Sequence, residues 1–199
     1  MSWLALGLIC AFLVLVFPAR TIRQRKWLAV GGRAWQARTR PPRWLLADVL
    51  FLVAFVLVVA GPALRVTGWL GAAWAAGVGA EVGVALLLGA AALATWAQET
   101  MGPAWRTDIA ADRTTALITS GPFAIIRNPT YVAMLAAALG TLLLAPSALG
   151  VAGIGLLAAS LVLTARYEEA ELALVHGQAY REYCARVGRF LPATRRRSR

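Results

Sequence analysis

Residues 131–165 read YVAMLAAALGTLLLAPSALGVAGIGLLAASLVLTA and contain no charged side chain. Pro146 divides this stretch into two apolar runs, each near the lower length limit for crossing roughly 30 Å of hydrocarbon. A proline between two such runs predicts a tight turn, because it cannot continue the first helix. The stretch therefore predicts a transmembrane hairpin, and we expect an all-α integral membrane protein.

The composition of the whole chain indicates the same class. Of its 199 residues, 60% are hydrophobic, and the mean hydropathy is +0.67, too apolar for a soluble domain with a polar surface. The formal net charge is +11, but the basic residues fall in connectors and a C-terminal tail rather than on one face. We expect membrane lipids, and no nucleic acid, as partners of these charges.

Three apolar runs precede the hairpin, which gives about five transmembrane helices. They cover about 3–17, 44–64 and 69–96, and Gly61-Pro62 marks the end of the second. The connector 20–43 carries several arginines and no acidic residue. The chain ends in Arg195, Arg196, Arg197 and Arg199. The positive-inside bias places both basic segments in the cytoplasm and the N-terminus outside.

After the hairpin, residues 166–187 alternate apolar and charged positions at helical spacing, which predicts an amphipathic cytoplasmic helix, bent near Gly177. Its expected first turn holds Glu168, Glu169 and Glu171, where carboxylates complement the helix dipole without any functional role.

Within the third run, Gly79 and Gly83 form a small-xxx-small pair that lets another helix approach closely. Glu81 lies near the middle of this run; we favour a structural glutamate over a catalytic one, because no other motif element is near it.

Several chemistries are excluded by the residue types present. Cys10 and Cys184 are far apart and His176 is the single histidine. These residues provide no metal-ligand spacing, and neither a Ser/His/Asp nor a Cys/His set. We expect no metal site and no serine or zinc hydrolase.

The motif Arg-Asn-Pro-Thr-Tyr at 127–131 predicts a helix start. Asparagine is a preferred N-cap and proline a preferred first helical residue, so Asn128 and Pro129 fit these positions. The free N–H groups of such a start, with Arg127 beside them, suit a carboxylate or phosphate. A plain helix cap, with Arg127 at lipid headgroups, explains the residues equally well.

Topology brings this motif to the same side as the acidic turn and a loop at Gly121-Pro122-Phe123. The loop offers exposed backbone and an aromatic ring for an adenosine, although Gly-Pro alone is ordinary turn chemistry. A ligand that carries a positive charge, a carboxylate and ribose hydroxyls would match these groups. S-adenosylmethionine is such a ligand.

Taken together, the motif residues have a specific order and spacing. They are Leu117, Thr119, Gly121, Pro122, Phe123, Arg127, Asn128, Pro129 and Tyr131 before the hairpin, and Glu168, Glu169, Leu172, Gly177, Tyr180, Tyr183, Val187, Phe190 and Pro192 after it. Over roughly residues 98–192 the chain resembles the isoprenylcysteine carboxyl methyltransferase and phospholipid methyltransferase superfamily, in its bacterial form.

The resemblance implies an S-adenosyl-L-methionine-dependent methyltransferase of the plasma membrane, or bacterial inner membrane. Its acceptor would be lipophilic: an isoprenylcysteine-type carboxylate on a prenylated substrate, or another lipid-like molecule that enters from the bilayer. Residues 1–97 would form an N-terminal three-span region, and residues 98–199 the methyltransferase-like cofactor-binding region.

The resemblance also implies the site residues by position. The cofactor-binding residues would be Gly121, Pro122, Phe123, Arg127, Asn128, Pro129, Tyr131, Glu168, Glu169 and Tyr180. The residues implied to act in catalysis, by placing the acceptor group, are Glu169 and Arg181.

The chain departs from the superfamily at two positions. Asn128 stands where a histidine is usual, and His176 replaces a common aromatic residue. An amide forms hydrogen bonds but takes no proton near neutral pH, which argues against a general base at residue 128. Two alternatives stay open: a membrane reductase of related architecture that uses a nicotinamide cofactor, and a non-catalytic membrane protein that retains the fold.

Overall fold

The structure, a computed structural model, describes residues 1–17, 42–71, 79–102 and 116–193. These residues form five α-helices: α1 Ser2–Val16, α3 Leu45–Val66, α4 Gly79–Met101, α5 Pro129–Leu144 and α6 Ala148–Arg186. Short 3-10 helices, η1 Pro42–Trp44 and η3 Gly121–Ala124, precede α3 and α5. Within the described ranges the only extended pairing is one parallel bridge between Ile126 and Gly188, so the predicted all-α class is confirmed there.

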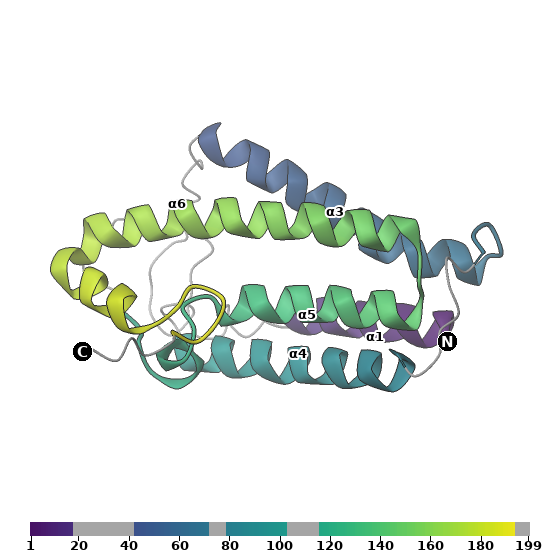
Figure 1. The fold of residues 1–199 in the computed structure, drawn as a ribbon, viewed down its shortest axis with the longest axis horizontal. Helices are drawn as coiled ribbons and strands as arrows, with labels where there is room; N and C mark the ends of the chain where they lie inside the picture. The colour runs from purple at the N-terminus through teal and green to yellow at the C-terminus, as the bar shows by residue number, and fades with distance from the viewer. Residues whose placement is uncertain (18–41, 72–78, 103–115, 194–199) are drawn as a thin grey trace, which may run out of the picture.

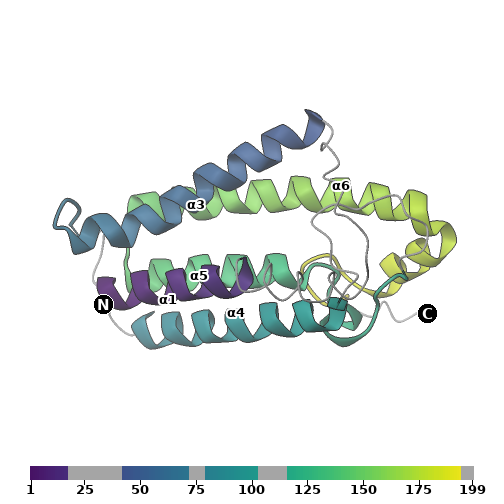
Figure 2. The same ribbon diagram turned by 180° about the vertical axis from the view of Figure 1, so that it is seen from behind.

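The helices lie lengthwise in two layers (Figure 1). One layer holds α3 and α6, and the other holds α1, α4 and α5; the view from behind shows the same division (Figure 2). Three helices, α3, α4 and α6, are long and apolar enough to cross a membrane, and α1 and α5 are shorter apolar helices. This is the pattern of an integral membrane protein.

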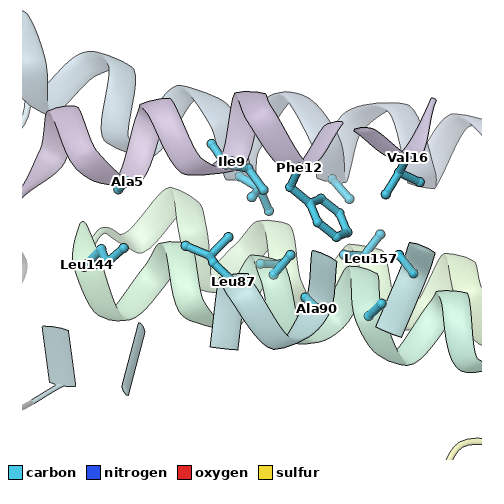
Figure 3. Packing of buried hydrophobic residues seen from close by; sticks show 14 of the residues in the cluster. Ala5, Ile9, Phe12, Val16, Leu87, Ala90, Leu144 and Leu157 are labelled. Carbon is cyan, nitrogen blue, oxygen red and sulfur yellow. The ribbon is translucent and has the colours of Figure 1, made fainter. Parts of the chain in front are cut away.

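The apolar core forms where α1 meets the other helices. Ala5, Ile9, Phe12 and Val16 recur at helical spacing along one face of α1 and are all buried. Figure 3 shows Ile9 and Phe12 in the same cluster as Leu87 of α4 and Leu157 of α6. One face of α1 therefore connects the two layers.

Small residues set how closely the helices approach. A Cβ atom added to Gly83 of α4 would lie 2.8 Å from the carbonyl oxygen of Gly140 in α5. A Cβ atom on Gly153 of α6 would lie 3.1 Å from the carbonyl oxygen of Ala54 in α3. Both helix pairs thus meet backbone to backbone, which small residues permit. The close approach predicted at Gly83 is confirmed.

Two details of the early spans differ from the prediction. Helix α3 agrees with the predicted run of about 44–64 to within two residues, but it continues through Pro62 to Val66, so Gly61-Pro62 does not mark its end. Gly61 lies against the turn before α6, where an added Cβ atom would be 2.5 Å from the Ser147 hydroxyl, so tertiary packing explains this glycine. Trp69 lies in an exposed turn rather than at the start of a helix.

Glu81 also lies elsewhere than predicted. It is in the first turn of α4, not near the middle of a span, and it is exposed. The connector up to residue 41, residues 72–78 and 103–115, and the arginines from Arg195 onward lie outside the described residues.

Helix α6 combines the second span of the hairpin with the predicted cytoplasmic helix. It continues past Ala165, the end of the uncharged run, and bends at Gly177, where φ is 54° and ψ is −120°, as predicted. Glu169 therefore lies about 30 Å from the start of its helix. The prediction that these glutamates open a helix and complement its dipole is wrong.

Candidate functional site

The start of α5 has the predicted N-cap and first residue. Asn128 is the N-cap, Pro129 is the first helical residue, and the N–H groups of Tyr131 and Val132 each donate to the Asn128 carbonyl at 3.2 Å. The Asn128 side chain makes no cap hydrogen bond. Its Nδ2 instead donates to the carbonyl oxygen of Arg189 at 3.2 Å, which ties the helix start to the chain that follows α6.

The residues after α6, Val187–Pro192, form a return segment that lies beside the start of α5 (Figure 1). The backbone N–H of Arg127 donates to the Gly188 carbonyl at 2.8 Å, and that of Asn128 donates to the Arg189 carbonyl at 3.1 Å. A Cβ atom on Gly188 would collide with the Leu191 carbonyl, so the tight path of this segment requires glycine.

One carboxylate joins two arginines at this end of the molecule. Glu169 Oε1 accepts from Arg127 Nη2 at 2.9 Å and from Arg189 Nε at 2.8 Å. Glu169 Oε2 accepts from Arg189 Nη2 at 2.6 Å. The Glu169 side chain is only 16% exposed, so most of this network is shielded from solvent.

All three side-chain nitrogens of Arg127 donate hydrogen bonds within the protein. Its Nε and Nη2 donate to Glu169, and its Nη1 donates to the carbonyl oxygens of Cys184 at 3.2 Å and Val187 at 2.6 Å. Its side chain is 11% exposed. Arg127 thus satisfies carbonyl groups at the C-terminal end of α6, as cationic side chains commonly do there.

Arg189 was not identified from the sequence. It lies in the return segment and holds Glu169 through Nε and Nη2, while its side chain is 35% exposed. Charge alone does not single it out among many arginines. The available signal was the bend at Gly177, which turns the last part of α6 back and brings residue 189 beside Glu169.

The ion pairs change the proton affinities of their members. Burial raises the pKa of the Glu169 carboxyl, but the hydrogen bonds from Arg189 and Arg127 outweigh it, and the pKa lies below its ordinary value. The hydrogen bond to Glu169 raises the pKa of Arg189. The network is therefore fully ionised at neutral pH.

Two buried tyrosines lie in the last part of α6, and one of them, Tyr183, connects it to the Gly121 loop. The hydroxyl of Tyr183 donates to the Phe123 carbonyl at 2.6 Å, and burial raises the pKa of Tyr183 to about 12. Burial also raises the pKa of Tyr180, which is 4% exposed. On the other side of the loop, a Cβ atom on Gly121 would lie 2.7 Å from Thr100 Oγ1 of α4, and its φ of +56° favours glycine.

The structure brings most of the predicted site residues to one end of the molecule. Pro122, Phe123 and Pro129 are buried there, and Tyr131 and Glu168 are half-buried. Arg181 is different: its side chain is exposed, and its Nε donates to Gln178 at 3.1 Å, within the same helix. No hydrogen bond or ion pair joins Arg181 to the Glu169 network within the described residues.

The site has the electrostatic character of an anion-binding region. Two guanidinium groups share one carboxylate, which leaves one positive charge in the network. The N-terminal end of α5, with its positive dipole, contacts the backbone of Arg189 through Asn128. The hydroxyl of Thr130, in the first turn of α5, is 4% exposed and has no hydrogen-bond partner among the described residues.

Comparison with protein-family models matches residues 83–176 to the isoprenylcysteine carboxyl methyltransferase (ICMT) family. The matched range begins within α4 and ends just before the bend in α6, so it contains the Gly121 loop, α5 and Glu169. It leaves out α1, α3 and the return segment. No curated protein matches the chain.

Proposed function

We propose, from the isoprenylcysteine carboxyl methyltransferase family domain that the chain contains at residues 83–176, that it methylates a carboxylate on a lipophilic acceptor in the membrane. Members of this family are S-adenosylmethionine-dependent carboxyl methyltransferases. The observation that carries the proposal is the polar network at Glu169: its members Arg127 and Glu169 lie inside the family domain, and the network lies at the end of an otherwise apolar bundle.

The groups around this network fit the cofactor. The network has an excess positive charge for a carboxylate, the buried Tyr180 is close enough to feel the charges of Glu169 and Arg127, and Tyr183 bonds to the Gly121 loop. We propose that the cofactor-binding residues are those carried over by position, from Gly121 to Tyr180. When bound, S-adenosylmethionine supplies a methyl group on a positively charged sulfur.

The chain's own residues then have to align the acceptor and exclude water, because methyl transfer is an in-line displacement. A carboxylate acceptor is already ionised near neutral pH, so no general base is needed. An asparagine at position 128 is compatible with this chemistry, because no proton has to be removed there. Its amide instead donates to the Arg189 carbonyl. We propose that Glu169 acts by positioning the two arginines. Arg181 stays a prediction for placing the acceptor.

An apolar groove between the two layers supports a lipophilic acceptor. Every side chain that lines it is apolar, including Phe12 and Phe17 of α1, Phe51 and Phe55 of α3, and Met134 of α5. Met134 lies about 9 Å along α5 from Asn128, at 1.5 Å per residue. We propose that the hydrocarbon part of the acceptor packs against the mouth of this groove from the bilayer while its carboxylate reaches the polar end.

We further propose that all five helices span the bilayer, with the N-terminus outside and the polar end in the cytoplasm. The charges that support this orientation are the arginines of the 20–43 connector and of the C-terminus. Labelling single cysteines at Ser2 and Ser198 in sealed vesicles, in a Cys10→Ala, Cys184→Ala background, tests the two sides. Labelling of both from the same side contradicts the proposed topology.

The test of function is titration of the detergent-purified protein with S-adenosylhomocysteine, followed by transfer of a radiolabelled methyl group into lipid extracts. We expect saturable binding that Glu169→Gln and Arg127→Ala abolish. Glu182→Gln is the matched control, because Glu182 is exposed on the same helix and accepts a hydrogen bond from Gln178 of that helix, at 3.1 Å. Binding of a nicotinamide cofactor instead would establish the reductase, and binding of neither cofactor would favour a non-catalytic protein.

A further inference from the structure

We propose that Arg189 binds the carboxylate of the amino-acid portion of S-adenosylmethionine, and that Glu169 and Arg127 position its guanidinium for this contact. The inference rests on the proposed function, because it presupposes this cofactor. The family domain ends at residue 176, so the family match assigns no role to Arg189.

The first step is that Arg127, the motif arginine, is already occupied. Each of its three nitrogens donates to a protein oxygen, from Glu169, Cys184 or Val187. A ligand carboxylate that bound Arg127 through two nitrogens would have to displace Glu169 or the carbonyl groups at the end of α6. Because those carbonyls would then lose a charged donor in a part-buried place, such an exchange is unfavourable.

In Arg189, by contrast, one edge of the guanidinium remains available to a ligand. Glu169 occupies the side formed by Nε and Nη2, with donor–acceptor distances of 2.8 and 2.6 Å. Its Nη1 has no partner among the described residues. A guanidinium held on one edge presents Nη1 and the second Nη2 hydrogen as a planar pair, which matches a carboxylate. At 35% exposed, the side chain is also the most accessible of the three charged groups.

The third step is the local field. Glu169 neutralises one of the two arginines, which leaves one positive charge in the network. The chain at Arg189 meets the N-terminal end of α5, where the Asn128 N–H donates to the Arg189 carbonyl at 3.1 Å, and Arg127 directly precedes this helix start. The unsatisfied hydroxyl of Thr130 lies in the first turn of the same helix. Both features favour an anionic, hydrogen-bonding ligand group at this end.

The chemistry favours the cofactor's carboxylate over that of the acceptor. The acceptor carboxylate is the nucleophile, and a bidentate guanidinium would stabilise its negative charge before transfer and so reduce its reactivity. The carboxylate of the cofactor takes no part in bond formation. A strong ion pair there adds affinity and fixes the donor's orientation without that cost.

The test compares two ligands that differ in the amino-acid portion. S-adenosylhomocysteine carries the carboxylate, and 5′-methylthioadenosine keeps the nucleoside and the sulfur but lacks it. We expect Arg189→Gln to weaken S-adenosylhomocysteine binding by about tenfold or more, the value of a charged hydrogen bond, and to leave methylthioadenosine binding unchanged. Arg189→Lys should restore part of the loss. Arg186 is also basic and is exposed at the end of α6, so Arg186→Gln is the matched control. It should change the binding of neither ligand.

The other outcomes contradict either the proposed function or the proposed role of Arg189. If wild-type protein binds neither ligand, the proposed function itself fails. If wild-type protein binds both and Arg189→Gln alters neither, or weakens both equally, Arg189 does not contact the carboxylate, while the proposed function stands. Thermal unfolding of each variant in detergent shows whether it is folded, and a folded Arg189→Lys keeps the test valid where Arg189→Gln unfolds.

Discussion

The apolar bundle and the polar end of this molecule are stabilised in different ways. In the bundle, α4 meets α5 and α3 meets α6 through glycines and alanines that allow close backbone contact. At the polar end, Arg127, Asn128 and Tyr183 form hydrogen bonds to residues 42 to 61 positions away in the sequence. Close packing of small residues stabilises the first region, and directed polar contacts stabilise the second.

This difference determines how each region responds to substitution. In the bundle, an added methyl group is harmful where two backbones touch and harmless one turn away, because packing is local. At the polar end, Glu169 is shared by Arg127 and Arg189, so the loss of one group removes contacts of the others. We expect additive effects in the bundle and non-additive effects at the polar end.

The largest effect is expected from Glu169→Gln. The change removes the negative charge between two guanidinium groups and should lower the free energy of unfolding by about 2 to 3 kcal/mol, the scale of hydrogen bonds to charged groups. Thermal unfolding in detergent measures it. In a double-mutant cycle with Arg189→Gln, the two losses should sum to more than the loss in the double variant. Simple additivity would contradict the view of the polar end as one network.

The same variant has a predicted pH dependence. The folded pKa of Glu169 lies below its reference value of 4.5, so its contribution to stability is complete above pH 4.5 and is lost as pH falls through the folded pKa. The stability difference between wild-type protein and Glu169→Gln should therefore be constant from neutral pH to about pH 5 and shrink below that. A difference that grows on acidification would have the wrong sign.

The next effect belongs to the bundle. Gly83→Ala places a methyl group 2.8 Å from the Gly140 carbonyl and should cost about 1 to 2 kcal/mol through separation of α4 and α5. Gly89→Ala on the same helix is the control, because an added Cβ atom meets nothing within 4 Å there. Unfolding curves of the two variants should differ clearly. If they coincide, backbone contact is not what holds the bundle.

The bundle was also the region that the sequence predicted best. Apolar runs placed α1 and the hairpin turn at Pro146 within a few residues, and a single glycine predicted the bend at Gly177. These signals are local, since hydrophobic periodicity and the turn residues act over a few positions. The error at Gly61-Pro62 has a tertiary cause, because that glycine serves contact with Ser147 rather than the end of a helix.

The polar end was predicted by position but not by contact. The motif placed Arg127, Asn128 and Glu169 at one site, and the structure does bring them together. It gave no sign that Arg127 and Glu169 bind each other, since pairings across 42 residues leave no local pattern. Arg189 lies between the motif residues Val187 and Phe190 but was not itself singled out, and Arg181 was chosen from a helix whose charged face is exposed.

A smaller effect is expected where the return segment joins α5. Asn128→Ala removes the hydrogen bond from Nδ2 to the Arg189 carbonyl and should cost about 1 kcal/mol, while the backbone bond to the same carbonyl stays. Asn128→His, which restores a ring donor, should recover part of this stability. Thermal unfolding of the two variants tests both statements. A loss with alanine as large as that of Glu169→Gln would show that residue 128, not Glu169, is central to the network.

The smallest effect is expected for the hydrogen bond between α3 and α6 inside the bundle. The Ser160 hydroxyl is fully buried and donates to the Ala47 carbonyl at 2.8 Å. Ser160→Ala should cost only about 0.6 kcal/mol, the average for polar contacts between membrane helices, because the carbonyl keeps its place in the α3 hydrogen-bond ladder. Thr164→Val, which removes a bond of 3.0 Å within α6, is the control and should cost less. If Ser160→Ala destabilises as much as Gly83→Ala, directed polar contacts also hold the bundle, and the contrast between the two regions is one of degree.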